Sequence, residues 1–411
     1  MAKPFNGGHA RGAQRAAVAK QRFLEFYRVG QYGKALAFLQ THMKRGGNSA
    51  GACSDAAVCC IHMERWDDAI AYAKRSLALD PKARAALDAL AHAYGAKRQW
   101  AEAREYGLRA LEIRDRSTAE LAPVALPLAE SGGSRQLIAF ALFGGDSKYC
   151  ESAILNCMEQ PAIYPDWTCR FYIDESVPPS IRERIEQAGG ETVLVDEEAA
   201  RWPGPMWRFL AYDEPDVSRV IFRDADSVIS EREAGAVREW MDSGLGFHAM
   251  RDTGSHTELL LAGLWGVKRG RLPRMRDMIR HYVSKPVASQ RFADQYFLRA
   301  YVWPCTRADL LQHDSVFGFG NWRPFPEGPH RADFHVGYAE GSPRFSAQTD
   351  IEDGAHVEWR LFDHAGAQPV LVCAYPAVVA AGKVEANLPA RYARQLASGG
   401  MRVRIGRLPE P

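Results

Sequence analysis

Residues 219–233 read RVIFRDADSVISERE, and this stretch decides how the second half of the chain is interpreted. A short apolar run ends in Asp224 and Asp226, which a single alanine separates. Acidic side chains are rare at the end of a buried strand unless a positive group waits for them. In an extended chain, residues i and i+2 point to the same side and lie about 6–7 Å apart. Two carboxylates so placed can hold one divalent cation, and Mg²⁺ or Mn²⁺ favours such hard oxygen ligands.

Apolar runs alternate with helical stretches around this motif, which predicts an α/β domain with a mostly parallel sheet. The runs are residues 137–143, 168–173, 191–195, 219–222, 246–250 and 259–267. In such sheets, ligands bind beyond the carboxyl ends of the strands. We therefore interpret Asp224 and Asp226 as a metal site at such an end. The alternative is a solvated turn whose aspartates cap a helix beginning near Ser230.

A helical repeat pattern precedes this domain. Aromatic residues and alanines recur with a period of 34 residues, at Tyr32, Trp66 and Trp100 and at Ala35, Ala69 and Ala103. Such a period is typical of stacked helix–turn–helix units, and the pattern resembles tetratricopeptide repeats over residues 15–116. Repeats of this kind present a concave face, so we expect a protein partner or a homodimer. The alternative is that the repeats only cap or orient the domain that follows.

Four segments are predicted from these patterns. Residues 15–116 form the helical repeats, and residues 117–136, which contain Gly132 and Gly133, form a linker. Residues 137–344 form the α/β domain. Residues 345–411 alternate strand-like runs with one helix-like stretch and are expected to form a small β-rich accessory lobe. The linker predicts that the repeats can be separated from the rest of the chain.

Composition narrows the class of protein. The 411 residues are 46% hydrophobic and 25% charged, which describes a globular protein with sizeable cores. A net charge of +2 argues against nucleic acid as the main partner. The 8 cysteines include no Cys-x-x-Cys pair and are interpreted as reduced thiols. We find no signal peptide and no apolar run near the roughly 20 residues that span a bilayer. The expected location is the cytoplasm, either free or peripheral to the inner membrane.

The span 137–340 resembles nucleotide-sugar glycosyltransferases of the GT-A fold, of the family-8 type. The resemblance rests on LFGGDSKYCESAILN from residue 142, MWRFLAYDEPDVSRVIFRDADS from 206, LLLAGLWGV from 259, ADQYFL from 293 and FHVG from 334. Bacterial glycosyltransferase-like proteins of this kind are often fused to repeats. The chain departs from the family at Leu261, where the family has asparagine, and at Tyr338-Ala339-Glu340, where it has Lys-Pro-Trp.

The resemblance implies a transferase that moves a sugar from a nucleotide-diphosphate donor to a polysaccharide, lipopolysaccharide or protein acceptor. The cofactor would be Mn²⁺ or Mg²⁺ held by the Asp-x-Asp motif. Asp226 is the first candidate for direct metal ligation, and Asp224 would reach the ribose or a metal-bound water. His335 is a candidate third metal ligand, with His330 as its rival.

Donor-binding residues follow from the same resemblance. Phe143 and Gly144 would lie in the nucleotide-facing loop, and Gly263 would allow close backbone approach to a ligand. Arg208 could pair with the diphosphate through its fork of donors. The alternative for Arg208 is a surface salt bridge to Asp213 or Glu214.

Three catalytic candidates remain. Asp252 ends a predicted strand and could deprotonate an acceptor hydroxyl, or it could simply pair with Arg251. Asp294 and Gln295 open a predicted amphipathic helix and could contact the donor sugar, although Asp294 could instead only cap that helix.

Two other functions are compatible with the sequence. The chain could be a repeat scaffold whose glycosyltransferase-like domain binds a nucleotide sugar without turnover. It could also be a haloacid-dehalogenase-like phosphatase, because Asp224-Ala225-Asp226-Ser227-Val228 fits the motif of that class. That class also needs a later acidic pair, for which the chain offers Glu352-Asp353.

Overall fold

The computed structural model describes residues 7–287, 289–328 and 334–408, and side chains from Val18 onward. The chain divides into two compact units. Unit 1 consists of Met1–Leu121 with two later segments, Met250–Leu261 and Gln312–Phe325. Unit 2 consists of Ala122–Ala249, Ala262–Leu311 and Pro326–Pro411. This division does not test the domain boundaries predicted from the sequence, which therefore stay a prediction.

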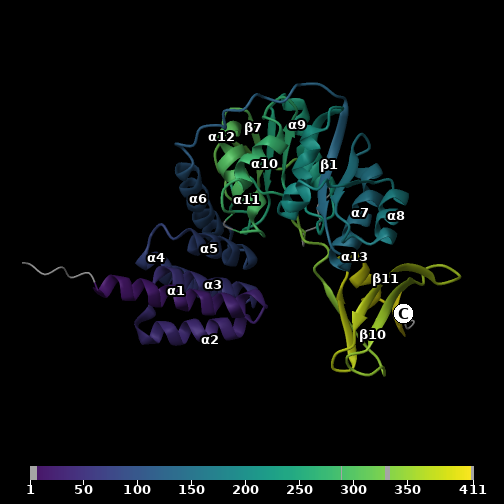
Figure 1. Cartoon of the computed structure of the whole chain (residues 1–411), viewed down its shortest axis with the longest axis horizontal. Helices are drawn as coiled ribbons and strands as arrows, with labels where there is room; N and C mark the ends of the chain where they lie inside the picture. The colour runs from purple at the N-terminus through teal and green to yellow at the C-terminus, as the bar shows by residue number, and fades with distance from the viewer. Residues whose placement is uncertain (1–6, 288, 329–333, 409–411) are drawn as a thin grey trace, which may run out of the picture. The chain divides into compact units, whose positions relative to one another are not determined.

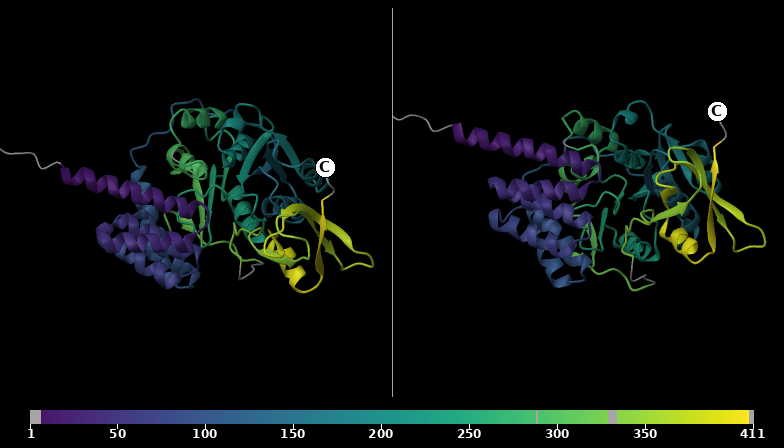
Figure 2. Two further views of the ribbon diagram at one scale, coloured as in Figure 1. Left: turned by 60° about the horizontal axis from the view of Figure 1, so that its bottom comes forward. Right: turned by 90° about the horizontal axis from the view of Figure 1, so that it is seen from below.

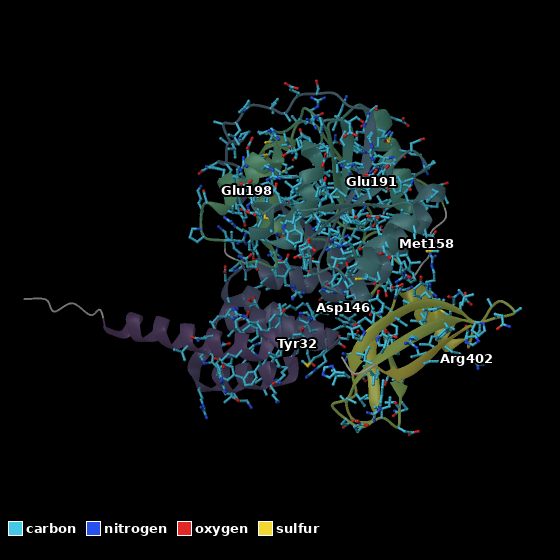
Figure 3. All side chains as sticks on the ribbon, turned by 45° about the vertical axis from the view of Figure 1, so that its right-hand side comes forward. Tyr32, Asp146, Met158, Glu191, Glu198 and Arg402 are labelled. Carbon is cyan, nitrogen blue, oxygen red and sulfur yellow. The ribbon has the colours of Figure 1, made fainter. Side chains whose placement is uncertain are left out.

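Unit 1 contains three helical hairpins, as the 34-residue period predicts (Figures 1 and 2). The helices are α1 (Gly7–Arg28), α2 (Tyr32–His42), η1 (Met43–Gly47), α3 (Ala50–His62), α4 (Trp66–Leu79), α5 (Arg84–Ala96) and α6 (Trp100–Ser117). The repeated aromatic residues are the first residues of α2, α4 and α6 (Tyr32 is labelled in Figure 3). Ala35, Ala69 and Ala103 are completely buried, which lets the paired helices approach closely. The prediction of tetratricopeptide-like helical repeats is confirmed.

The last repeat packs against the two later segments of unit 1. Gly95 near the end of α5 lies so close to Gly254 that a Cβ on Gly95 would come within 2.9 Å of the Gly254 Cα. Gly107 of α6 likewise lies against the ring of Phe317. Terminal repeats need a cap over their exposed apolar face. Here segments from beyond residue 250 supply that cap. Whether the repeats can be separated at Gly132 and Gly133 stays a prediction.

A buried ion pair also joins the last repeat to the segment Met250–Leu261 of unit 1. The side chain of Arg114 on α6 is 6% exposed and donates to Asp88 of α5 at 2.7 Å and to Glu258 at 3.1 Å. Burial alone would lower the pKa of the Arg114 guanidinium, but the two carboxylates raise it above its ordinary value. Arg114 therefore stays charged and joins the last hairpin to the segment that contains Glu258.

An eight-stranded sheet has the order β3-β2-β1-β4-β6-β5-β7-β8. The strands are β1 (Arg135–Leu142), β2 (Thr168–Ile173), β3 (Glu191–Leu194), β4 (Val217–Phe222), β5 (Phe247–Arg251), β6 (Trp265–Lys268), β7 (Leu310–Asp314) and β8 (Trp322–Arg323). The pairs β1–β2, β2–β3, β1–β4 and β7–β8 are parallel, whereas β6 is antiparallel to β4 and β5. The prediction of a mostly parallel sheet is confirmed.

The predicted strand 259–267 is wrong in its first part, because only β6 from Trp265 onward joins the sheet. The backbone N–H of Ala262 donates to the side chain of Gln295 at 3.1 Å instead of to a strand. Gly263 lies directly against the side chain of Asp224. The first part of this apolar stretch therefore packs against the side chains of Gln295 and Asp224. Its hydrophobicity reflects burial and not the pairing of a strand in the sheet.

Both faces of the sheet are covered around β1, which explains its nearly continuous apolar sequence. Ile138, Phe140 and Leu142 belong to a buried cluster with helix α7 (Ser147–Ile163). On the other face, the 3₁₀ helix η3 (Gly204–Asp213) contacts β1, β2 and β4. Phe209 of η3 packs edge-on against Phe222 of β4, with 5.2 Å between ring centroids.

The remaining helices connect the strands or follow the sheet. They are α8 (Pro179–Gln187), η2 (Ala199–Arg201), α9 (Glu231–Ser243), α10 (Met275–Val283), α11 (Ala293–Phe297), η4 (Leu298–Val302) and α12 (Trp303–Thr306). Helix α9 begins one residue after Ser230, whose hydroxyl caps it by accepting from the backbone of Glu233. Asp224 and Asp226 therefore do not cap this helix.

The end of the chain forms a small antiparallel lobe, as predicted. Its elements are β9 (Arg344–Gln348), β10 (His356–Asp363), β11 (Val370–Val378), β12 (Lys383–Asn387), α13 (Ala390–Ala397) and β13 (Met401–Arg407), with sheets β11-β10-β13 and β12-β9. Tyr375 of β11 donates to the buried Glu151 of α7, which also binds Arg184 of α8. The lobe is thus fixed to the α/β part of unit 2. No helix in the described part of the chain is long and apolar enough to cross a membrane.

Candidate functional site

The site lies where the strand order of the sheet reverses. From β1, the chain places β2 and β3 on one side, and β4 lies on the other. Phe143 and Gly144 follow β1, and Asp224 and Asp226 follow β4. Because β1 and β4 are parallel neighbours, both pairs of residues leave the sheet at the same edge. In open α/β sheets, such a reversal point is where ligands bind.

Asp224 is held by a buried arginine. Arg208 of η3 donates from Nη1 to Asp224 Oδ1 at 2.5 Å and to the carbonyl oxygen of Arg223 at 2.9 Å. Its Nη2 donates to Asp294 Oδ2 at 2.6 Å. The Arg208 side chain is 4% exposed, whereas the Asp224 side chain is 51% exposed. Arg208 therefore pairs with two site carboxylates, and not with Asp213 or Glu214 as the alternative interpretation had it.

Arg208, Asp224 and Asp294 form a charged triad, in which burial and pairing shift the pKa values of Arg208 and Asp294. Burial would lower the pKa of Arg208, but Asp224 and Asp294 raise it above its ordinary value. Burial raises the pKa of Asp294, and the nearby Asp224 adds to this, although Arg208 counteracts both. The Nε of Arg208 is buried and has no hydrogen-bond partner among the described residues. A buried donor without a partner is costly, so Arg208 carries one unsatisfied donor inside this cluster of charges.

Asp226 is paired with a lysine that the sequence analysis overlooked. Lys148 lies in the first turn of α7, and its Nζ is 2.9 Å from Asp226 Oδ2. Asp146 caps α7 by accepting from the backbone N–H of Lys148, which fixes the start of the helix (Figure 3 labels Asp146). Burial would lower the pKa of Lys148, but the hydrogen bond to Asp226 raises it. The sequence offered one weak signal for Lys148: it comes two residues after Asp146, which caps the helix that follows the first strand.

Gly263 and Gln295 build the wall behind Asp224. A Cβ on Gly263 would meet Asp224 Oδ2 at 2.2 Å, so no other residue fits there without moving the carboxylate. The Gln295 side chain accepts from the N–H of Ala262 and thereby holds this stretch in place. Asp294 adjoins Gln295 in α11 and reaches Arg208, so both residues of the predicted Asp–Gln pair support the site.

Phe143 and Gly144 line the edge beyond β1. The Phe143 side chain is 45% exposed, and its ring packs edge-on against Trp207 of η3 with 5.7 Å between centroids. Gly144 has a φ of +73° and donates from its N–H to the hydroxyl of Ser176 at 2.7 Å. An exposed aromatic ring beside a glycine with positive φ gives a ligand both an apolar surface and close access to the backbone.

The segment after residue 334 contacts the same motif through its backbone. The N–H of Gly341 donates to the carbonyl oxygen of Asp226 at 3.1 Å. The hydroxyl of Ser227 donates to the carbonyl oxygen of Gly337 at 3.2 Å. His335 interacts through Nδ1 with the carbonyl oxygen of Val336 at 2.9 Å. This segment therefore holds the Asp-x-Asp turn in place.

No group of three or more His, Cys, Asp and Glu side chains in the described ranges is arranged to hold a metal ion. His335 is thus not brought together with Asp224 and Asp226 as a third ligand. His330, the rival ligand, lies outside the described residues. The two carboxylates would still suit Mg²⁺ or Mn²⁺, because such ions in phosphate sites often use one or two carboxylates, with substrate oxygens and waters as the other ligands.

Asp252 belongs to unit 1 rather than to the unit that contains the other candidates. It is buried, its Oδ1 accepts from the hydroxyl of Ser315 at 2.7 Å, and its N–H donates to His256 Nδ1 at 3.0 Å. The neighbouring Arg251 donates to the carbonyl oxygens of Glu258 and Leu259. The role of Asp252 as a base stays a prediction.

Comparison with known proteins gives only distant likenesses. No protein family and no curated protein matches this sequence. Among solved structures, the first tetratricopeptide domain of human RPAP3 is 19% identical, with a TM-score of 0.23 over 24% of this chain and 77% of that one. The TPR2B domain of yeast Sti1 is 21% identical, with a TM-score of 0.24 over 25% of this chain and 82% of that one.

A longer match is a mutant form of the O-GlcNAc transferase of Thermobaculum terrenum. It is 14% identical, with a TM-score of 0.28, and the match covers 45% of this chain and 42% of that chain. Likeness at this level does not bear on activity. The fold and site described above therefore rest on the geometry of this chain alone.

Proposed function

We propose that this protein is a glycosyltransferase that moves a sugar from a nucleoside-diphosphate donor to a glycan or protein acceptor. The observation that carries the proposal is the pairing of two acidic and two basic side chains where the strand order reverses. Asp224 is paired with Arg208, and Asp226 is paired with Lys148. A diphosphate needs cationic partners, and a cation that helps to bind it needs carboxylates. This edge of the sheet supplies both.

The basic side chains would act on the diphosphate. Arg208 is buried and already bonded to Asp224, Asp294 and the carbonyl oxygen of Arg223, so it would act on the diphosphate through its charge. Lys148 carries a point charge on a flexible stem and would contact phosphate oxygens. Both would stabilise the negative charge that develops on the leaving diphosphate as the sugar–phosphate bond breaks. Mn²⁺ or Mg²⁺, when bound by Asp224 and Asp226, would supply further charge stabilisation as a Lewis acid.

The supporting residues fit donor binding. The exposed ring of Phe143 offers a surface for a nucleotide base, and Gly263 keeps the wall behind Asp224 free of a side chain. Asp294 and Gln295 would face the donor sugar while they hold Arg208 and Ala262. The repeats would recruit the acceptor, a protein partner or a second copy, and the protein would work in the cytoplasm or peripheral to the inner membrane.

A second candidate is a scaffold that binds a nucleotide sugar without turnover. It is favoured by one observation: Lys148 and Arg208 already neutralise both carboxylates of the motif. A phosphatase of the haloacid-dehalogenase type is disfavoured, because its required later acidic pair is engaged elsewhere. Asp353 accepts backbone N–H groups of Ala381 and Gly382, and Glu352 pairs with Arg407 in the terminal lobe.

Binding of UDP, GDP and ADP with and without Mn²⁺, measured by calorimetry, tests the proposal. At least one diphosphate should bind, and Mn²⁺ should strengthen it. A bound ligand at about a hundred-fold excess over its Kd should also stabilise the fold by about 2.7 kcal/mol. Hydrolysis or transfer of the matching nucleotide sugar would separate the transferase from the scaffold. Failure of all three diphosphates to bind, or an aspartyl-phosphate formed on Asp224, would rule the proposal out.

A further inference from the structure

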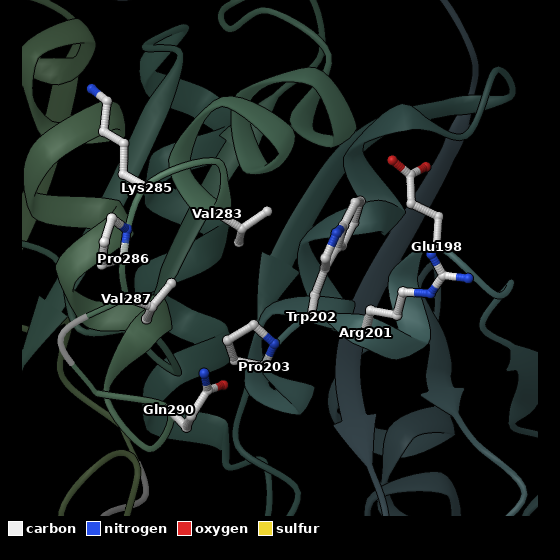
Figure 4. Close-up of a pocket in the computed structure, with 9 residues that line it drawn as sticks. All are labelled: Glu198, Arg201, Trp202, Pro203, Val283, Lys285, Pro286, Val287 and Gln290. Atoms are coloured by element: carbon white, nitrogen blue, oxygen red, sulfur yellow. The ribbon is translucent and has the colours of Figure 1, made fainter.

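Unit 2 contains a pocket of about 470 Å³ between η2 and the segment that follows α10 (Figure 4). Trp202 on its wall is 7% exposed, and the guanidinium of Arg276 lies over its ring, 5.5 Å from the centroid. The charged ends of Arg201 and Lys285 lie on opposite sides of the pocket and point away from it. Small-molecule sites need convergent polar groups, which this pocket lacks. An exposed surface of the terminal lobe is better suited to a partner.

The sheet β11-β10-β13 of this lobe has one buried face and one exposed face. Side chains alternate between the two faces along each strand. Trp359, Leu361 and Tyr375 lie on the buried face, in the cluster that also contains residues of α7 and α8. The pairing of the strands places the opposite side chains in rows across the sheet. This outer face of the lobe carries Arg360 and Phe362 of β10, Leu371 and Val378 of β11, and Arg402 and Arg404 of β13 (Figure 3 labels Arg402).

Strand β11 gives the outer face an apolar side. It is an edge strand of this sheet, and its nine residues include no charged side chain. Val370, Leu371 and Val378 are 63%, 52% and 50% exposed. Exposed edge strands usually carry charged side chains, which prevent association. An uncharged and exposed edge strand therefore indicates contact with a partner that has an apolar region.

Strands β10 and β13 give the outer face a positive side. Arg402 and Arg404 are exposed, and they make no ion pair with any residue that the structure describes. The guanidinium of Arg404 lies over the ring of Phe362, 4.9 Å from its centroid. Arg360 differs from these two arginines, because it pairs with Glu358 at 2.5 Å. Two positive charges therefore remain on the outer face.

A surface that is apolar on one side and basic on the other fits a layer of acidic lipids. Such a layer offers negative charge at the headgroups and an apolar region directly beneath them. A soluble polyanion would match Arg402 and Arg404, but it would leave the exposed side chains of β11 in water. A second copy of this chain, packed face to face, would bring the arginines of both copies together. Charge complementarity therefore favours the lipid layer over these two partners.

We propose that the outer face of the lobe binds a membrane surface that contains acidic lipids. Leu371 and Val378 enter the headgroup layer, and Arg402 and Arg404 pair with lipid phosphates. The strength of such binding grows with the buried apolar area and with the electrostatic attraction to acidic lipids. The inference rests on the lobe alone and does not depend on sugar transfer. It selects the membrane surface from the two locations considered for the proposed function.

Co-sedimentation of the full chain with vesicles tests this inference. The vesicles contain phosphatidylcholine alone, or phosphatidylcholine and phosphatidylglycerol at two to one. The natural protein should bind only the second kind, and added NaCl should weaken the binding, because salt screens the charges. Arg402→Gln with Arg404→Gln should weaken it at least about tenfold, since each arginine near an acidic surface contributes roughly fivefold. Leu371→Ser with Val378→Ser should weaken it by about tenfold or more, because apolar burial is lost.

Matched controls remove the same kinds of side chain from unit 1. Arg28→Gln with Arg45→Gln removes two exposed arginines, and Val29→Ser with Leu79→Ser removes two exposed apolar side chains. Both controls should bind the acidic vesicles as tightly as the natural protein does. All four double variants change exposed side chains, so the fold should survive, and thermal unfolding checks this for each of them.

The inference is overturned if the natural protein binds neither kind of vesicle, if it binds both kinds equally, or if either double variant of the lobe binds undiminished. Binding to heparin that the change at Leu371 and Val378 leaves intact, without binding to vesicles, would identify a soluble polyanion instead. A dimer in light scattering that the same change dissociates, again without vesicle binding, would identify a second copy.

Binding of UDP, GDP and ADP with Mn²⁺ is measured on the same samples. If a diphosphate binds and the acidic vesicles do not, only the inference about the lobe fails. If the acidic vesicles bind and no diphosphate does, the proposed function fails while the assignment of the outer face stands.

Discussion

Arg208 connects the residues of the candidate site, because it pairs with both Asp224 and Asp294. Its partners differ in exposure, since Asp224 is half exposed and Asp294 is 9% exposed. Breaking a buried ion pair leaves the remaining charge without compensation. Removing Arg208 should therefore destabilise the fold mainly through the unpaired charge of Asp294, and the loss of stability should depend on pH.

Arg208→Met should destabilise the fold by about 3 kcal/mol at neutral pH, the usual cost of removing one partner of a buried pair. Removal of the guanidinium raises the already elevated pKa of Asp294 further. A carboxyl with a raised folded-state pKa contributes stability that is present below its unfolded pKa and lost as pH rises through the folded value. The loss of stability relative to the natural protein should thus be smaller at about pH 5 than at about pH 8, as measured by urea denaturation.

Adding Asp294→Asn to Arg208→Met is the control for this prediction. The neutral amide removes the unpaired charge, so the double variant should regain stability at about pH 8 and lose the pH dependence. A deficit that stays constant with pH would show that Asp294 is not the group left uncompensated.

Gly263→Ala should move the Asp224 carboxylate, because the new Cβ would lie 2.2 Å from Oδ2. The Asp224 side chain is half exposed and can swing away, so we expect the fold to survive. Nucleoside-diphosphate binding should weaken by about tenfold or more, as for a lost charged contact. Gly406→Ala is the matched control, since no atom lies within 4 Å of its added Cβ. Equal binding by both variants would separate Asp224 from the donor site.

Sequence reasoning found Asp224, Asp226 and Arg208, but it found neither Lys148 nor the way in which these side chains pair. Asp224 and Asp226 stand out because carboxylates at the end of an apolar run are unusual. Arg208 and Asp294 are 86 residues apart, and their pairing depends on how η3 and α11 pack. Lys148 is an ordinary residue of a first helical turn until the fold brings it to Asp226 after β4. Such pairings come from tertiary packing, which spacing along the chain does not encode.

At the scale of elements, the repeat hairpins have a common turn. Gly30, Glu64 and Arg98 occupy equivalent positions before α2, α4 and α6, with φ angles of 72°, 55° and 58°. Positive φ favours glycine, and other L-residues pay about 1–2 kcal/mol there. The first hairpin has glycine at this turn, and the other two do not. The 34-residue period predicted the helices but not this strained turn.

Glu64→Gly should therefore stabilise unit 1 by up to about 1 kcal/mol, because relief of the strain exceeds the added chain entropy of glycine. Glu64 is exposed, and we expect no loss of packing. Thermal and urea unfolding would measure the change. Glu25→Gly inside α1 is the control and should destabilise by about 1 kcal/mol. A Glu64→Gly protein less stable than the natural one would show that the turn is not strained.

At the scale of the whole chain, unit 1 is assembled from segments far apart in sequence. The sequence predicted the repeats and the sheet, because both have regular periods. It could not predict that segments after β5 and β7 cap the last repeat. Those contacts depend on small residues, such as Gly95 and Gly254, that carry no periodic signal.

Gly95→Ala tests this cap. In a helix this change normally stabilises, but here the new Cβ would come within 2.9 Å of the Gly254 backbone. We expect a loss of about 1–3 kcal/mol, typical of overpacking, and faster hydrogen exchange in Met250–Leu261. Gly51→Ala in α3, which has no atom within 4 Å of its added Cβ, should be neutral or stabilising. Similar stability and exchange in the two variants would contradict the capping contact.

The central claim is that the protein transfers a sugar from a nucleoside-diphosphate donor, and that the reaction takes place at the Asp-x-Asp motif. Turnover of a panel of nucleotide sugars with Mn²⁺, compared between the natural protein, Asp226→Asn and the exposed control Asp166→Asn, tests it most directly. We predict that the natural protein and the control consume at least one donor. Asp226→Asn should be about 10²–10³-fold slower, the usual cost of one charge-stabilising group, and excess EDTA should have a comparable effect. Full turnover in Asp226→Asn, or no turnover of any donor by the natural protein, would contradict the account.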